Sequence, residues 1–231
     1  MEATILCYHK VGSASEEGRR LNIEPSRLRS HVRFFSRKKF DFLRVGDLSS
    51  PWKPGIVCFT FDDAYESTMF HAPQIFDEVG GKATFYAVSN RVGGTSAWDA
   101  NLARPLANWD VLRSVQSGGH EIGNHTANHI HLDRATASVQ LQEVRSAHER
   151  LLSEGIQPLS FCYPYGSYNA SAVEQVGLVG YKTAVILGKR ISQDIDKRLE
   201  LPRIVVAYSD TLPMLLYKLK VKPLLKRLKT R

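Results

Sequence analysis

Two clusters of polar residues in this sequence have the types and spacing that metal-assisted hydrolysis requires. Asp62 and Asp63 come directly after the apolar run at residues 56–61. Because successive residues of an extended chain point in opposite directions, these two carboxylates can serve different purposes. His125 and His129 are four residues apart, so they would share one face of a helical turn and could bind one metal ion together with a carboxylate. Either pattern alone also fits an ordinary polar turn or an exposed pair, and only their combination predicts a metal site.

Both clusters follow short apolar runs of the kind that forms buried strands. Seven such runs are expected to be strands, at residues 4–8, 56–61, 83–88, 120–123, 159–163, 181–186 and 203–207. Longer segments with a helical period lie between them, at residues 25–39, 67–79, 108–117, 136–153 and 170–176. Strands that alternate with helices predict a parallel sheet with helices outside it.

About seven parallel strands fit either an open doubly wound sheet or a closed β/α barrel. Both architectures place their active sites at the C-terminal ends of the strands, which is where the two clusters and residues 163–166 lie. The segments at residues 12–20 and 91–104 are rich in Gly, Ser and charge. We expect these two segments to be loops that cover the same face and shape the substrate site.

The length and composition predict one main domain. A chain of 231 residues with 43% hydrophobic and 10% aromatic residues can bury one substantial core. We expect residues 1–210 to form this domain and residues 211–231 to form a basic amphipathic tail. The N-terminus lacks the features of a secretory signal, and the three cysteines have the apolar neighbours of buried thiols. These observations predict a cytoplasmic protein.

The net charge of +8 is concentrated in the tail. Residues 211–231 contain seven basic residues and no acidic one, which leaves +1 for the rest of the chain. No nucleic-acid partner is therefore predicted. Leu212, Leu215, Leu216 and Leu219 form an apolar stripe at helical spacing, and a second set repeats it from residue 221 on. The tail could dock on the barrel as a helix or bind the anionic inner face of the membrane, and we slightly favour the membrane.

The motifs of this chain resemble those of the polysaccharide deacetylase family, also called the NodB homology domain or carbohydrate esterase family four. Residues 60–63 read Thr-Phe-Asp-Asp, as in the first family motif, and residues 125–129 match the second, His-Thr/Ser-x-x-His. Further stretches look like one branch of that family, at residues 6–11, 163–166 and 201–204. The resemblance spans roughly residues 4–207.

The resemblance implies a distorted β/α barrel in which Asp63, His125 and His129 bind a divalent metal ion, usually zinc. It also implies that Asp62 is the catalytic base and that the backbone N–H of Tyr165 stabilises the oxyanion together with the metal. The implied reaction removes an N-acetyl group from an amino sugar. A nucleotide-linked or lipid-linked intermediate of surface polysaccharide biosynthesis is the expected substrate.

The chain departs from the family pattern at two positions. The third family motif has an Arg where this chain has Cys162, and Arg203 could supply that guanidinium from a later strand or could instead cap the rim of the barrel. The last family motif provides a His as general acid, and the corresponding part of this chain contains none. His9, which ends the first strand, is our candidate for this role, and Asp62 after protonation is the alternative.

Two other functions stay open at this point. An amidase or deformylase that acts on another acyl group would have the same metal site, so only its products would differ. A catalytically weak sugar-binding protein would explain the missing Arg and His, and turnover would distinguish it from an enzyme.

Overall fold

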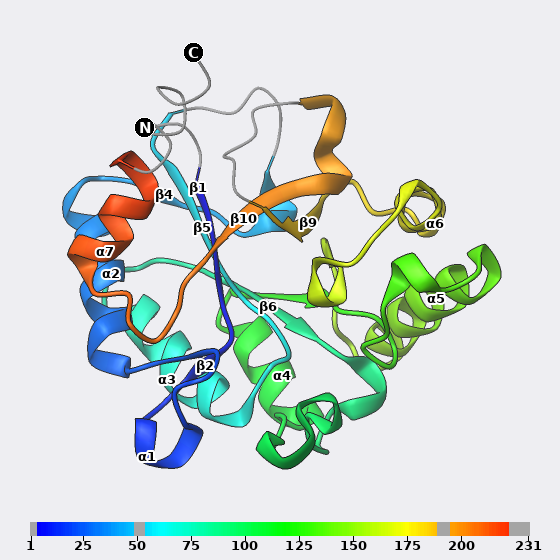
Figure 1. Ribbon diagram of the computed structural model, residues 1–231, viewed down its shortest axis with the longest axis horizontal. Helices are drawn as coiled ribbons and strands as arrows, with labels where there is room; N and C mark the ends of the chain where they lie inside the picture. The colour runs from blue at the N-terminus through cyan, green and yellow to red at the C-terminus, as the bar shows by residue number, and fades with distance from the viewer. Residues whose placement is uncertain (1–3, 49–53, 189–194, 222–231) are drawn as a thin grey trace.

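Seven parallel strands close into a barrel at the centre of the molecule (Figure 1). This computed structural model describes residues 4–48, 54–188 and 195–221. The strands follow one another around the ring in the order β1 (Thr4–Tyr8), β10 (Leu201–Val205), β9 (Ala184–Leu187), β8 (Phe161–Cys162), β7 (Glu121–Asn124), β6 (Thr84–Ala87) and β5 (Ile56–Phe61). Pairing of β1 with β5 closes the ring. The predicted β/α barrel of about seven parallel strands is confirmed.

Three short strands lie outside this ring. β4 (Asp41–Phe42) pairs with the start of β5, whereas β6 pairs with the end of the same strand. β2 (Lys10–Val11) and β3 (Asn22–Ile23) form a separate parallel pair after β1. The sequence did not predict them, because two residues are too few to show the alternation of a strand.

Helices cover the outside of the barrel, at the positions that the helical period predicts (Figure 1). They are α2 (Pro25–Arg37), α3 (Glu66–Asp77), α4 (Trp109–Ser117), α5 (Ala137–Ser153) and α6 (Ala170–Val179). The side chains of Asn108, Thr136 and Asn169 accept hydrogen bonds from backbone N–H groups in the first turns of α4, α5 and α6. Such caps fix where a helix begins and therefore how long the preceding loop is. The two predicted loops contain the short helical turns α1 (Ala14–Glu17) and η3 (Ala97–Leu102).

Alternate residues of each strand belong to two different cores. On β5, Val57 and Phe59 pack against the helices in the largest apolar cluster, whereas Cys58 belongs to a second cluster. That second cluster draws residues from six of the seven barrel strands and fills the barrel interior. Leu201 of β10 belongs to it, and Arg203, two residues further on, therefore also points inward.

The described part of the tail packs on the barrel. α7 (Leu212–Leu216) continues into one turn, η7 (Tyr217–Val221), and α7 lies beside α2 (Figure 1). Leu215 and Leu219 are buried in the main core. These two leucines therefore follow the alternative in which the tail docks on the barrel. They are not free to contact a membrane.

Leu212 and Leu216 are partly buried and Val221 is exposed, whereas Leu224, Leu225 and Leu228 of the second predicted set lie outside the described residues. In the part of the chain that the structure describes, no helix is both long and apolar enough to cross a membrane. The division of the chain at residue 210 stays a prediction.

Two buried histidines make the fold sensitive to acid. His31 on α2 is completely buried, with Nδ1 3.1 Å from the Tyr8 hydroxyl, and burial lowers its pKa to about 4. His120, before β7, accepts a hydrogen bond from the Ala83 N–H through Nδ1, and burial again lowers the pKa to about 4. The unfolded chain takes up these protons at its ordinary pKa of about 6.5, so acid favours unfolding. We expect each histidine to lower the free energy of unfolding by about 2 kcal/mol between pH 7 and pH 5.

Denaturant unfolding at these two pH values measures this loss. His31→Asn and His120→Asn keep an acceptor near the position of Nδ1 but cannot take up a proton, so each should reduce the pH-dependent loss by about 2 kcal/mol. His71→Asn, at a half-exposed position on α3, is the control and should leave the loss unchanged. An equal loss in the wild type and in both buried-site variants would contradict the assignment.

Candidate active site

A carboxylate and two imidazoles converge at the C-terminal end of the barrel. Asp63 follows β5, and its Oδ1 lies 3.2 Å from Nε2 of His129 and 3.6 Å from Nε2 of His125. The three side chains are buried, and their ligand atoms lie within 4.8 Å of one another. Oδ1 of Asp63 has no hydrogen-bond partner among the described residues. A buried carboxylate oxygen that makes no hydrogen bond to the described residues and lies beside two imidazole nitrogens fits a divalent cation such as zinc.

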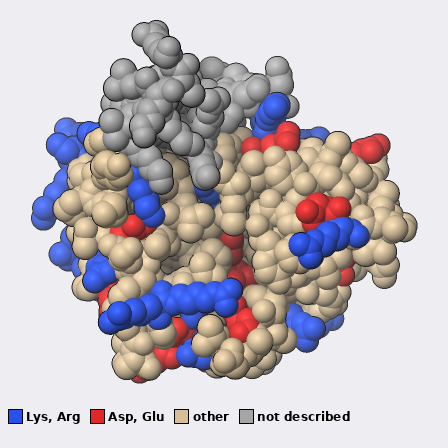
Figure 2. Space-filling model, viewed as in Figure 1, with Lys and Arg blue, Asp and Glu red and all other residues tan. Residues whose placement is uncertain are grey.

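One face of the molecule carries acidic side chains in a hollow. Figure 2 shows a furrow near the middle of the molecule in which acidic side chains are visible, with basic side chains at its edges. Acidic side chains in such a hollow attract positive ions.

His125 is held in the tautomer that a metal ligand needs. Its Nδ1 donates a hydrogen bond of 2.8 Å to the backbone carbonyl of Cys162 on β8. This bond leaves the lone pair of Nε2 directed toward Asp63. Burial lowers the pKa of His125 to about 4, so the imidazole is neutral near pH 7 and no proton has to leave before it binds a metal.

The segment between the two histidines is not the helical turn that their spacing suggested. It is irregular, with Thr126 at φ 67° and His129 at φ 59°, both in the left-handed region. The Asn124 side chain accepts a hydrogen bond from the Thr126 N–H, and the Thr126 hydroxyl accepts one from the His129 N–H. These two bonds stabilise the left-handed backbone, which brings His129 back toward Asp63. The expected convergence of the histidines is observed, but the expected backbone was wrong.

Asp62 turns away from this cluster and pairs with Arg203. The guanidinium NH1 lies 2.6 Å from Oδ1 of Asp62, and NH2 lies 2.7 Å from Oδ2. Arg203 is completely buried and also donates to the Thr60 hydroxyl and to the Cys162 thiol. Burial acts to raise the pKa of Asp62, but the charge and hydrogen bonds of Arg203 outweigh it and hold the pKa below its usual range. Arg203 therefore lies inside the barrel and does not cap its rim.

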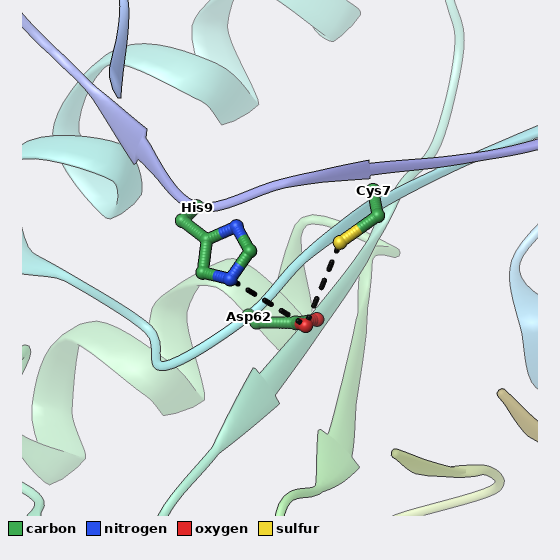
Figure 3. A group of neighbouring side chains, drawn as sticks. All are labelled: Cys7, His9 and Asp62. Carbon is green, nitrogen blue, oxygen red and sulfur yellow. Dashed lines mark hydrogen bonds and ion pairs between the residues drawn. The ribbon is translucent and has the colours of Figure 1, made fainter. Parts of the chain in front are cut away.

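His9 and Cys7 also lie close to the Asp62 carboxylate (Figure 3). Nε2 of His9 is 3.9 Å from Oδ2 of Asp62, and the Cys7 thiol is 3.6 Å from the same oxygen. Asp62 thus belongs to two further groups with metal-ligand atoms, one with His9 and Cys7 and one with His125 and Cys162. In both groups the bound guanidinium of Arg203 opposes a cation. The cluster around Asp63 is therefore the candidate metal site.

Aromatic rings from two loops cover His129. The Tyr165 ring lies 4.5 Å from it at 64° and stacks on His131 at 4.0 Å, and Tyr165 itself has a left-handed backbone at φ 59°. On another side, Trp98 stacks on the His129 ring at 4.1 Å and 23°. The sequence assigned Trp98 to a loop over this face but did not single it out, and the only signal was a large aromatic residue in a polar loop.

Comparisons with known proteins agree with this description. The polysaccharide deacetylase family model matches residues 50–184, which is more than half of the chain, and the protein therefore belongs to that family. The peptidoglycan-N-acetylglucosamine deacetylase of Bacillus cereus is 26% identical over 133 residues, 56% of this chain and 55% of the relative. The chitin deacetylase of Colletotrichum lindemuthianum is 28% identical over 133 residues, 56% of this chain and 49% of the relative. The match thus spans about half the length of these curated relatives.

The fold has close counterparts among solved structures. The Streptococcus pyogenes deacetylase PplD, solved in complex with acetate, superposes with a TM-score of 0.78 at 20% identity, covering 95% of this chain and 99% of that one. At this identity the similarity establishes the shared barrel fold and no more.

Proposed function

We propose that this protein is a metal-dependent hydrolase that removes the N-acetyl group from an amino sugar. One observation supports this most strongly. The Asp62 carboxylate, which is paired with Arg203, lies beside the cluster of Asp63, His125 and His129 that fits a divalent ion. The Asp62 carboxylate can take up a proton, and the cluster around Asp63 can bind a metal ion that acts as a Lewis acid. A metal-dependent amide hydrolase uses both.

Asp63, His125 and His129 would hold the ion, with zinc as the proposed metal. When bound, such an ion polarises an amide carbonyl and lowers the pKa of water toward neutrality. Asp62 would accept the proton of the attacking water, and the low pKa of its carboxyl keeps it ionised and ready to do so. Arg203 would keep that carboxylate oriented through its two parallel hydrogen bonds.

The remaining steps need an oxyanion donor and a proton donor. The backbone N–H of Tyr165 is our proposed donor to the oxyanion. His9 is our proposed general acid, because its Nε2 lies only 3.9 Å from the carboxylate that takes up the water proton. The oxygen of water joins the acyl carbon, the amide C–N bond breaks, the nitrogen leaves with a proton, and the products are acetate and a free amine.

The position of Arg203 weakens the case for a sugar-binding protein without activity. That alternative rested partly on Cys162 standing where the family has an Arg. In the structure, Arg203 donates to the Cys162 thiol and pairs with Asp62, so a guanidinium is present beside the proposed base. We further propose that the substrate is a lipid-linked or nucleotide-linked amino sugar of surface polysaccharide biosynthesis. Contact of the tail with an anionic membrane would then have to involve residues other than Leu215 and Leu219, which are buried.

Product analysis tests the proposed function. Purified protein loaded with zinc should release acetate from N-acetylglucosamine oligomers or from nucleotide-linked N-acetylglucosamine. Asp62→Asn, which keeps the shape of the proposed base but accepts protons poorly, should lower the rate by about 10²-fold or more. Release of formate from N-formyl analogues with none of acetate would favour the deformylase. Metal-loaded protein that binds these sugars and releases nothing would favour a binding protein.

A further inference from the structure

The two imidazoles of the proposed metal site are held in different ways. His125 donates its Nδ1–H to a backbone carbonyl, the usual arrangement for a metal-binding histidine. Nδ1 of His129 is buried and has no hydrogen-bond partner among the described residues. Without such a bond, the orientation of the His129 ring has to come from the side chains that pack on it.

Among the described residues, Trp98 has its ring nearest to the His129 imidazole. The two rings are 4.1 Å apart and close to parallel, at 23°, so the indole covers one face of the imidazole. Tyr165 contacts the same imidazole more edge-on, at 4.5 Å and 64°. A stacked indole restricts rotation of the imidazole about its side-chain bonds, which a hydrogen bond would otherwise do.

The segment that carries Trp98 is tied to the backbone beside Asp63. Residues 94–106 form a hairpin, closed by antiparallel backbone hydrogen bonds between Ser96 and Arg104 and between Gly94 and Leu106. Tyr65, two residues after Asp63, is bridged to Leu106, and its hydroxyl donates to Asp99 at 2.7 Å. Because Asp99 is next to Trp98, this bond sets the position of the indole relative to the Asp63 turn.

We propose that Trp98 is a positioning residue that holds the His129 imidazole in the orientation required for metal binding. The hairpin at residues 94–106 then joins two of the three proposed ligands into one unit, through the indole on His129 and through Tyr65 near Asp63. This inference rests on the metal site of the proposed function.

Zinc affinity, measured by competition with a chromophoric chelator, tests the proposal. Trp98→Ala should weaken zinc binding by about 10-fold to 100-fold, the range for loss of a group that orients a metal ligand. Trp98→Leu keeps an apolar side chain but removes the ring, so it should lose affinity in the same way if the stack is what matters. Trp98→Phe keeps an aromatic ring and should restore affinity close to the wild type.

The visible absorption spectrum of the cobalt-substituted protein gives a second measurement. It reports the geometry of the metal ligands, which a general loss of fold stability would not change selectively in the Ala and Leu variants. The spectrum should differ in the Ala and Leu variants and be retained in the Phe variant. Trp109→Ala is the matched control, because Trp109 lies on the outer helix α4 beneath Arg150 and should affect neither measurement.

The two proposals fail in different ways. Wild-type protein that binds neither zinc nor cobalt would overturn the metal site itself. Wild-type protein that binds zinc, with equal affinity and an equal cobalt spectrum in Trp98→Leu, would overturn only the role of Trp98.

Discussion

Asp63→Ala is expected to abolish stoichiometric metal binding and, with it, turnover. The variant removes one of three proposed ligands and the only negative charge among them, so affinity should fall by more than about 100-fold, beyond the usual effect of a residue that merely orients a ligand. Oδ1 of Asp63 has no hydrogen-bond partner among the described residues but lies 3.2 Å from Nε2 of His129, and alanine tolerates the left-handed backbone at φ 71° less well than aspartate, so a modest loss of stability in the metal-free protein is expected. Elemental analysis after gel filtration measures the metal, and thermal unfolding of the metal-free protein measures the fold.

Two further variants complete this experiment. His125→Ala should lose the ion in the same way. Asp110→Ala should keep it, because Asp110 is an exposed aspartate on α4 that pairs with neighbouring Arg113 on the surface. One divalent ion per chain in Asp63→Ala would show that the ion binds elsewhere. No ion in the wild type, even after addition of zinc, would remove the hydrolytic mechanism altogether.

Arg203→Met should lower turnover by about 10²-fold to 10⁴-fold while the metal content stays at the wild-type level. Without the guanidinium, the main group that lowers the pKa of the Asp62 carboxyl is lost and burial raises that pKa, so the proposed base becomes protonated at higher pH. The acid limb of the pH–rate profile should therefore move upward. Loss of the partner of a buried carboxylate should also cost about 3–5 kcal/mol of stability, so activity is best measured well below the unfolding temperature.

Arg203→Lys keeps the charge but not the two parallel hydrogen bonds, and its turnover and acid limb should lie between those of the wild type and the Met variant. Arg29→Met provides the control, because Arg29 pairs with Glu78 on the surface, where such a pair contributes little. Wild-type turnover with an unmoved acid limb in Arg203→Met would remove Arg203 from the mechanism.

The barrel strands could be predicted because burial on both sides leaves a clear pattern. All six residues of β5 are buried, and the sequence there is an uninterrupted apolar and Thr run. β10 was expected to begin at Arg203 but begins at Leu201, which packs in the barrel interior. Side chains two residues apart in a strand point to the same side. Had the strand been predicted to begin at Leu201, Arg203 would also have been predicted to point into the barrel. By contrast, β4 has an exposed first residue and a half-buried second one, so it carries no such pattern.

The ligands of the site could be predicted from motif residues, but the way in which they are held could not. The carbonyl of Cys162 that orients His125 is a backbone group, so no residue type in the sequence could have indicated this hydrogen bond. The contact of Trp98 with His129 depends on how the hairpin at residues 94–106 folds back over the barrel. The tail leucines had a pattern that fits either a membrane surface or a protein core, and only the packing of Leu215 and Leu219 distinguishes the two.

The left-handed backbone at Asp63, Thr126, His129 and Tyr165 limits how this site could be moved to another protein. Each such conformation costs roughly 1–3 kcal/mol at a residue other than glycine, and the surrounding structure has to supply that energy. A designer who copied only the ligand side chains onto a regular barrel would place them on relaxed loops that aim them elsewhere. A transplant would have to include the loops after β5, β7 and β8 as complete segments, together with the hydrogen bonds that hold them.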